Sequence, residues 1–299
     1  MRQSIALRQQ MRDSITSELA QRTQAHQARI AAFQTNRAQM LAAGAAPPAN
    51  PLVFLAHGDS WFDYPLNGND VTLGTTDIIA QLETMGTIHP LVQNISHFGD
   101  ATTEEMSLPK QQSLIQSLRD KANWLNGTGP DAILFSGGGN DIAGNQFCIY
   151  LDFAGPGVDG LNSSRFQGVL DMVEASYNDL FAFRDKNAPG VPIFGHCYDF
   201  PIPNGAHPLC AGPWLLPSLN FAGWNTAQGK AILHEALLRF RALLARFAGN
   251  PKNLFTLVDT QGTLDAADWA NELHPFPAGF KKLAAKFVDA LQAHFPGRI

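Results

Sequence analysis

After residue 51 the chain alternates between short apolar runs and longer stretches of mixed polarity. The apolar runs lie at residues 52–56, 90–95, 132–136, 191–197 and 254–259. Runs of this length, bounded by glycine, proline or polar residues, are typical of strands buried on both faces of a sheet. The pattern therefore predicts five buried strands.

Between these runs apolar residues recur at helical spacing. Helices are expected at residues 77–85, 109–125, 166–183 and 224–247, and a last one follows the fifth run. The last helix carries its apolar residues on one face: Phe280, Leu283, Ala284, Phe287, Val288 and Leu291. Strands that alternate with helices form right-handed crossovers and a mostly parallel sheet covered on both faces. Such sheets bind ligands beyond the carboxyl ends of their strands, so chemistry is expected just after each run.

The N-terminal segment has a different pattern. No proline or glycine interrupts residues 1–43, and apolar residues recur every three, four or seven positions at Met11, Ile15, Leu19, Ile30, Phe33 and Met40. This predicts one long amphipathic helix of about 40 residues, ended by the linker 44–51. We expect residues 1–46 to form an arm with its linker and residues 47–299 to form the main domain. The arm is predicted to pack on the body or on a second copy of the chain, because its apolar face is thin for a membrane surface.

Charge separates the same two parts. Residues 1–50 hold six arginines, no lysine and two acidic residues, a net charge of +4, which leaves −9 for residues 51–299 in a chain of net charge −5. The acidic balance disfavours nucleic acid as a partner, since phosphate binding needs a basic excess. With 45% apolar and 16% charged residues among 299, the chain can bury a core. No apolar run long enough for a transmembrane helix and no export signal is seen, so a cytoplasmic location is the default expectation, with export by another route left open.

The three cysteines give no sign of a disulfide scaffold or a zinc site. Cys148, Cys197 and Cys210 are scattered and form no C-x-x-C pair. Free thiols are favoured over a bridge between Cys197 and Cys210.

Polar, glycine-bearing segments follow the first three strands, and a fourth precedes the last helix. A serine needs a base to take its proton during attack, and histidine suits that role near neutral pH. Ser60 and His274 are the pair we expect to act together. The backbone N–H of Ser60, the close backbone approach that Gly99 permits and the side-chain amide of Asn140 are candidate donors for a developing oxyanion. The segments are residues 58–60, 96–100, 137–141 and 271–275.

In order and spacing these segments resemble the SGNH, or GDSL-type, hydrolases, a superfamily of esterases and lipases. The likeness spans residues 52–292 and rests on Gly58-Asp59-Ser60, Gly99, Gly138-Gly139-Asn140-Asp141 and His274-Pro275. It implies a flavodoxin-like three-layer α/β fold with a five-stranded sheet, with the N-terminal arm outside it. It also implies Ser60 as nucleophile, His274 as base, and Ser60, Gly99 and Asn140 as the oxyanion hole, without a metal or other cofactor.

One position departs from the family pattern. The last block of the family reads D-x-x-H, and here Asn271 stands at the acid position. Loss of the carboxylate in a serine protease costs about 10⁴ in turnover through the wrong histidine tautomer. A neutral acceptor near Asn271, such as a backbone carbonyl, or a displaced acid could still orient His274. We favour a Ser-His dyad oriented by a carbonyl or by Asp268 over one oriented by Glu272.

Several neighbouring residues have plainer explanations. Asp59 and Asp141 are expected to brace their turns through hydrogen bonds to the backbone. Trp61, Phe62 and Tyr64 pack in the core or line an acyl pocket. Residues 142–165 and 198–223 are expected to form the loops that shape this pocket. The histidines show no metal-ligand spacing, and the segments fit a metallophosphoesterase poorly because Asp141 stands where that class has histidine.

The sequence thus predicts a serine hydrolase that cleaves carboxylic esters of small molecules, lipids or carbohydrates through an acyl-serine. A carbohydrate O-deacetylase or an acyltransferase is the alternative among enzymes. A catalytically weak ester-binding or interaction protein is the alternative in another class. The N-terminal helix is the candidate surface for a homo-oligomer.

Overall fold

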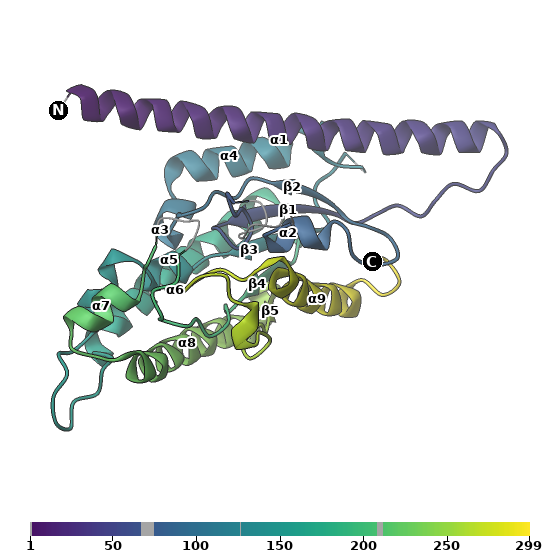
Figure 1. Ribbon diagram of the computed structural model, residues 1–299. Helices are drawn as coiled ribbons and strands as arrows, with labels where there is room; N and C mark the ends of the chain where they lie inside the picture. Colours follow the sequence, from purple (N-terminus) through teal and green to yellow (C-terminus); the bar gives the residue numbers. More distant parts are fainter. Residues whose placement is uncertain (1, 67–74, 126, 208–211) are drawn as a thin grey trace.

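A parallel sheet of five strands forms the centre of the molecule (Figure 1). The computed structural model describes residues 2–66, 75–125, 127–207 and 212–299. The strands lie in the order β2-β1-β3-β4-β5, and every neighbouring pair is parallel. Each overlaps one of the predicted runs, so the predicted flavodoxin-like three-layer α/β fold is confirmed. The strands are β1 (Val53–Gly58), β2 (Leu91–Asn94), β3 (Ala132–Ser136), β4 (Ile193–His196) and β5 (Phe255–Val258).

The central strands are apolar because both faces of the sheet are covered. Every residue of β1, β3 and β4 is buried. In the register of the sheet, Gly58 of β1 lies opposite Ser136 of β3, and His196 of β4 lies opposite Val258 of β5. The carboxyl ends of the strands therefore meet at one edge of the sheet, as the strand pattern predicts.

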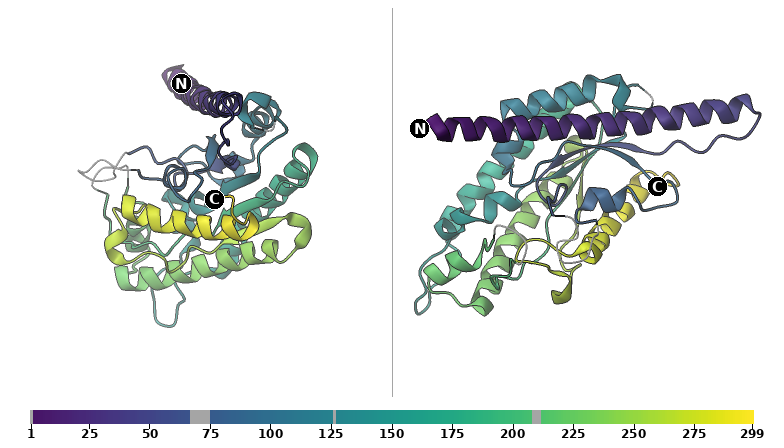
Figure 2. Two further views of the ribbon diagram at one scale, coloured as in Figure 1. Left: turned by 90° about the vertical axis from the view of Figure 1, so that its right-hand side faces the viewer. Right: turned by 45° about the horizontal axis from the view of Figure 1, so that its top comes forward.

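Helices connect the strands and cover both faces of the sheet. Successive right-handed crossovers place α2 and α9, which pack together, on one face, and α4, α6 and α8 on the other (Figures 1 and 2). The longer ones begin at sequence signals, such as the Asn225 side chain that caps α8. The helices are α2 (Ile78–Leu82), α3 (Thr102–Glu105), α4 (Leu108–Arg119), α5 (Gly139–Ile142), α6 (Ser163–Asn187), α7 (Leu216–Phe221), α8 (Thr226–Ala248) and α9 (Pro277–His294).

The prediction for residues 109–125 was too long. Helix α4 ends at Arg119, because the Asp120 side chain accepts a hydrogen bond from Ala122 N at 3.0 Å and starts a separate 3-10 turn, Lys121–Asn123. The short helices α3, α5 and α7 were not predicted. Helices of four to six residues carry too few apolar positions to show a period.

The N-terminal arm is a single helix, α1 (Arg2–Ala42), that lies along the edge of the sheet beside β2 (Figures 1 and 2). The body of the chain shields one face of α1. The residues in the middle of this face are mostly polar. Among the described side chains of α1, only His26 and Ile30 are fully buried. Hydrogen bonds hold this face: His26 Nε2 lies 2.9 Å from Asn123 O, and Gln93 Nε2 donates to Thr23 Oγ1 at 2.8 Å. The helix thus packs on the body of its own chain, while a homo-oligomer through it and the division at residue 46 stay predictions. The shielded positions are Ile15, Leu19, Arg22, Thr23, His26, Gln27, Ile30, Phe33, Arg37 and Met40.

Two further expectations concern membranes and thiols. In the described part of the chain, no helix combines the length and apolar character needed to cross a membrane. Cys148 is exposed and Cys197 is buried. Cys210 lies outside the described residues, so its pairing is untested.

Candidate active site

The segment after β1 forms a tight turn, residues 59–63, which we call the nucleophile turn. Phe62 N and Asp63 N both donate to Asp59 O, at 3.0 and 3.1 Å, and this places Ser60 at the start of the turn. Gly58 allows β1 to approach β3 closely, since a Cβ there would lie 2.4 Å from Ser136 O. The sequence therefore presents Ser60 at the carboxyl end of the central strand.

The segment before α9 folds back on itself as a base loop, residues 270–275. Ala270 N and Asn271 N both donate to His274 O, at 3.0 and 3.2 Å. The indole Nε1 of Trp61 donates to Leu273 O at 3.1 Å, which ties the base loop to the nucleophile turn. His274 is thereby held over Ser60.

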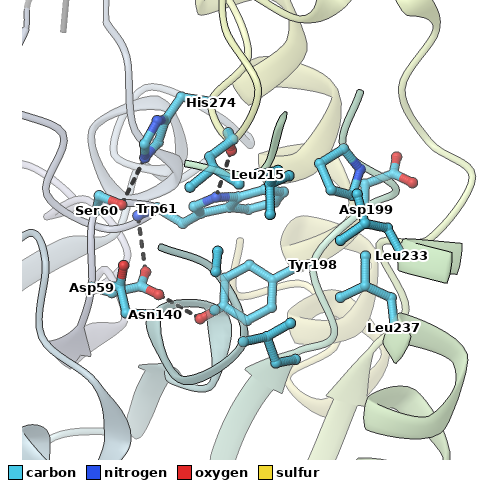
Figure 3. Close-up of a pocket in the computed structure, with 15 residues that line it drawn as sticks. Asp59, Ser60, Trp61, Asn140, Tyr198, Asp199, Leu215, Leu233, Leu237 and His274 are labelled. Atoms are coloured by element: carbon cyan, nitrogen blue, oxygen red, sulfur yellow. Dashed lines mark hydrogen bonds between the residues drawn. The ribbon is translucent and has the colours of Figure 1, made fainter. Parts of the chain in front are cut away.

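Ser60 and His274 form a hydrogen-bonded pair (Figure 3). Ser60 Oγ lies 2.8 Å from His274 Nε2, and His274 Nδ1 lies 3.2 Å from the side-chain oxygen of Asn271. An amide oxygen only accepts hydrogen bonds, so Nδ1 carries the proton and Nε2 is free to accept from Ser60. Burial lowers the pKa of His274 from 6.5 to about 3. The imidazole is therefore neutral and in the tautomer that a general base requires.

The Asn271 side chain is itself held in one orientation. Its Oδ1 also accepts from the backbone N–H of Leu273 and of His274, at 3.0 and 2.8 Å. Its Nδ2 donates to the Tyr64 hydroxyl at 3.2 Å, and the Tyr64 ring centroid lies 4.3 Å from that of His274. The oxygen of Asn271 must therefore face the imidazole.

The two acidic candidates for the orienting role lie elsewhere. The Asp268 carboxylate contacts Lys282 Nζ at 2.7 Å and accepts from Asp265 N at 2.8 Å, so the prediction that Asp268 orients His274 was wrong. Glu272 is fully buried and accepts four backbone N–H groups. It fixes the loops that precede α7 and does not turn toward His274. The donors are Gly205, Trp214, Leu215 and Leu216.

The second and third segments lie beside Ser60. Residues 95–100, which we call the Gly99 loop, follow β2, and Gly99 has φ +87° with no atom within 4 Å of where a Cβ would stand. Backbone conformation, and not crowding within the chain, therefore requires glycine there. Asn140 Nδ2 donates one hydrogen to Asp100 O at 2.9 Å, which leaves its second hydrogen for a ligand. One cavity is lined by Ser60, Gly99, Asn140 and His274 together.

Asp59 and Asp141 brace the turns around the site. Asp59 Oδ1 accepts from Trp61 N at 3.0 Å, as expected of a turn-holding residue. The same carboxylate accepts from Ser136 Oγ at 2.7 Å. It also accepts from the Tyr198 hydroxyl at 2.5 Å (Figure 3). Burial raises the pKa of Asp59 to about 6, although these two hydrogen bonds act to lower it. Asp141 accepts from the N–H and hydroxyl of Thr102, at 2.9 and 2.8 Å, and so joins the third segment to the loop after Gly99.

Tyr198 was not found from the sequence. It lies two residues after β4, with φ +57°, a conformation that non-glycine residues rarely adopt. Its position beyond a strand end was the available signal, but nothing in the sequence indicates that its hydroxyl reaches the nucleophile turn.

Two cavities meet at Ser60 and His274. The inner one, about 50 Å³, is apolar and runs between α5 and α8, with Leu215, Leu233 and Leu237 on the side away from Ser60 (Figure 3). The outer one, about 410 Å³, is lined by the aromatic rings of Tyr64, Phe98 and Trp214.

The three residues predicted to line a pocket are divided by the structure. Trp61 lines the inner cavity and Tyr64 the outer one. Phe62 is fully buried and packs on His196 and Phe287, with ring centroids 5.8 and 5.7 Å away. Of the two roles left open for Phe62, the structure therefore supports core packing and not pocket lining, because its side chain points from the turn into the core. Among the residues that the structure describes, no three His, Cys, Asp or Glu side chains form a group that could hold a metal ion.

Solved structures of other proteins share the fold of this chain. An extracellular lipase from Streptomyces rimosus is similar in structure, with 18% identity, 80% of this chain and 99% of that chain covered, and a TM-score of 0.51. A lipase from a goat rumen metagenome has 15% identity, 80% and 97% coverage, and a TM-score of 0.50. The chain has the SGNH hydrolase fold. No protein-family model and no curated protein matches its sequence.

Within this SGNH fold, the segments that carry the sequence resemblance converge on one site. Ser60 comes from the end of β1, Gly99 from the loop after β2, Asn140 from α5 and His274 from the base loop. The position where the SGNH pattern has aspartate is filled by Asn271, whose neutral oxygen contacts His274.

Proposed function

We propose that this chain is a serine hydrolase that cleaves carboxylic esters through an acyl-serine intermediate. The observation that carries the proposal is the 2.8 Å contact between Ser60 Oγ and the unprotonated Nε2 of His274. A serine hydroxyl within hydrogen-bond reach of a neutral imidazole, with a cavity on either side, is well suited to acyl transfer. The fold shared with the two lipases is consistent with it.

In the proposed reaction Ser60 Oγ attacks the acyl carbon while His274 Nε2 takes its proton. The carbonyl electron pair moves to the oxygen, which the N–H groups of Ser60 and Gly99 and the free hydrogen of Asn140 Nδ2 stabilise. Collapse of this intermediate breaks the bond to the alcohol oxygen, which receives the proton from Nε2. Water then attacks the acyl-serine by the same steps and releases the acid.

Asn271 takes the position that an aspartate holds in a Ser-His-Asp triad and supplies one of the two contributions of that aspartate, the orientation of the histidine. Its oxygen fixes the tautomer and ring orientation of His274 and accepts the Nδ1 hydrogen throughout. It adds no negative charge beside the imidazolium that forms. We infer that the tautomeric part of the triad's function is retained and the electrostatic part is reduced.

The two cavities favour a short acyl group and a larger alcohol. The inner cavity of about 50 Å³ is lined by Leu215, Leu233 and Leu237, which suits a small apolar acyl chain. The outer cavity is wider and aromatic, which suits an alcohol that must leave after the first step. Because aromatic faces also pack on sugar rings, a carbohydrate O-deacetylase is the second candidate function.

Steady-state hydrolysis of short-chain aryl esters by the wild type, Ser60→Ala and His274→Ala tests the proposal. We expect both variants to lose at least about a thousandfold in kcat, since removal of either member disables the pair. Activity that survives in Ser60→Ala would overturn the mechanism. Release of acetate from acetylated sugars by the wild type, compared with release from aryl acetates, decides between the two candidate functions.

A further inference from the structure

Among the described side chains of the N-terminal helix, Arg22 reaches the segments that carry the candidate active site. Its guanidinium donates from one nitrogen to Asp63 Oδ1 at 2.5 Å and from another to Ser96 O at 3.1 Å. Asp63 ends the nucleophile turn, and Ser96 lies in the Gly99 loop, three residues before Gly99. A residue of α1 therefore joins the two segments that supply two of the three proposed oxyanion donors, the N–H groups of Ser60 and Gly99.

The contact is partly buried and matched in charge. The Asp63 side chain is 11% exposed and that of Arg22 is 26% exposed. Burial raises the pKa of Asp63, and Arg22 opposes that rise. Burial alone would lower the pKa of Arg22, but Asp63 and Glu18 raise it above its ordinary value. The planar guanidinium fork reaches the carboxylate and the carbonyl from two separate nitrogens, a fixed geometry that the compact ammonium of lysine lacks.

The two segments are also joined on the body's side, where His97 N of the Gly99 loop donates to Gly58 O, directly before the nucleophile turn, at 2.9 Å. Asn94, at the end of β2, donates to Phe62 O at 2.7 Å and accepts from Ser96 N at 3.0 Å. Asn94 and Arg22 thus hold the nucleophile turn and the Gly99 loop from two directions. Without Arg22, Ser96 O loses this donor and the partly buried Asp63 carboxylate loses its cation.

We propose that α1 is a working part of the active site, in which Arg22 is a positioning residue that fixes the nucleophile turn relative to the Gly99 loop. An oxyanion hole acts only when its donors converge on one point, and a displacement of about 1 Å can cost about a hundredfold in rate. Arg22 touches no reacting atom and acts through the backbone that presents Ser60 N–H and Gly99 N–H. The inference rests on the proposed function only where kcat is measured, because a change in the positions of the two segments can also be measured without activity.

The same helix offers a matched control in Arg29. Its guanidinium contacts the Glu83 carboxylate at 2.7 Å and donates to Val92 O at 3.2 Å, again one acid and one backbone carbonyl. Val92 lies inside β2 and Glu83 follows α2, so neither belongs to the nucleophile turn or the Gly99 loop. Loss of Arg29 should weaken the attachment of α1 to a similar degree without disturbing the site.

The experiment compares full-length wild type, Arg22→Ala, Arg22→Lys and Arg29→Ala, each assayed well below its unfolding temperature. Arg22→Ala is expected to lower kcat on a short-chain aryl ester by about 10- to 100-fold, with KM changed less than about threefold. Arg29→Ala is expected to stay within about twofold of wild type. Arg22→Lys keeps the charge beside Asp63 but loses the fixed fork that spans both acceptors, so its kcat should lie between those of wild type and Arg22→Ala.

Amide hydrogen exchange provides a readout that needs no activity. Peptides covering residues 59–64 and 95–101 should exchange faster in Arg22→Ala than in Arg29→Ala. Equal kcat and equal exchange in the two alanine variants would overturn the inference. A wild type without hydrolysis would refute the proposed function, and the exchange comparison would then still decide the role of Arg22. If Arg22→Ala does not fold, the comparison of Arg22→Lys with Arg29→Ala decides on the same two measurements.

Discussion

The side-chain oxygen of Asn271 lies 3.2 Å from Nδ1 of His274. A neutral amide thus stands where the resembling hydrolases have a carboxylate, and it faces the imidazole with the same kind of atom. Two backbone N–H groups and the Tyr64 hydroxyl hold it there. The imidazole of His274 is therefore oriented by a neutral group that places no negative charge beside it.

This arrangement predicts an acid-tolerant enzyme. Burial lowers the pKa of His274 to about 3, so the base stays unprotonated as the pH falls below the ordinary histidine value of 6.5. We expect kcat/KM to stay level from about pH 7 to about pH 5, because its acid limb reports the free base. A limb near pH 6.5 would contradict the neutral environment described for His274.

Asn271→Asp should move that limb. A carboxylate beside Nδ1 favours the imidazolium, so the pKa of His274 and the acid limb of kcat/KM should rise by at least about one pH unit, and kcat near neutral pH should increase. The control is Asp268→Asn, which changes charge three residues away without touching His274. If both variants give the same profile as wild type, Asn271 does not act on the base.

The oxyanion role of Asn140 can be tested with an isosteric change. Asn140→Asp replaces the donor with a negative oxygen beside the developing oxyanion, and we expect kcat to fall by about 10²- to 10³-fold or more. The loop contact to Asp100 O is lost in the same variant. Asn140→Ser, which can donate, should therefore recover part of kcat. Equal activity of the two variants would place the donor elsewhere.

The inner cavity predicts a preference for short acyl chains that one leucine controls. Leu237 of α8 lines this cavity. Leu237→Ala should raise kcat/KM for hexanoyl and octanoyl esters relative to acetyl esters by about tenfold, because it lengthens the cavity. Leu244→Ala, also buried on α8 but away from the cavity, should lower stability without changing the ratio. An unchanged ratio in Leu237→Ala would mean that the acyl chain binds elsewhere.

The buried Glu105 predicts a pH-dependent stability. Neither of its carboxylate oxygens has a hydrogen-bond partner among the described residues, and burial raises its pKa well above 4.5. The folded chain keeps this proton while the unfolded chain loses it above pH 4.5, so this group's contribution to stability falls as the pH rises.

Glu105→Gln should therefore stabilise the protein more at about pH 8 than at about pH 5, as measured by urea unfolding. The exposed neighbour Glu104 gives the matched control, Glu104→Gln, for which little pH-dependent difference is expected. A gain in stability that is the same at both pH values would show that Glu105 is ionised in the folded chain.

Most of the fold follows from the sequence because it depends on averages over many residues. The five strands are buried on both faces, so each appears as a continuous apolar run, and the long helices show their period. The pair of Ser60 and His274 was predicted from chemistry together with the resemblance to the SGNH pattern, since chemistry alone also allows the adjacent Ser96 and His97. The contact between Ser60 and His274 could be expected because parallel strands end at one edge of the sheet.

The remaining details depend on directions that a sequence does not contain. Phe62 and Tyr64 lie two positions apart in the same turn region, yet one side chain enters the core and the other faces the site. Asp268 was a reasonable orienter by spacing, but its carboxylate turns to Lys282. Arg22 lies on a helix rich in arginine, and nothing in its spacing indicates that it contacts the nucleophile turn.

The central claim is that Ser60 is the nucleophile, and the most direct test is covalent labelling. Wild-type protein treated with a fluorophosphonate should gain one adduct, mapped by mass spectrometry to the peptide that contains Ser60. Ser60→Ala should gain none, and His274→Ala should react far more slowly. An adduct on another residue, or undiminished ester hydrolysis by Ser60→Ala, would contradict the account.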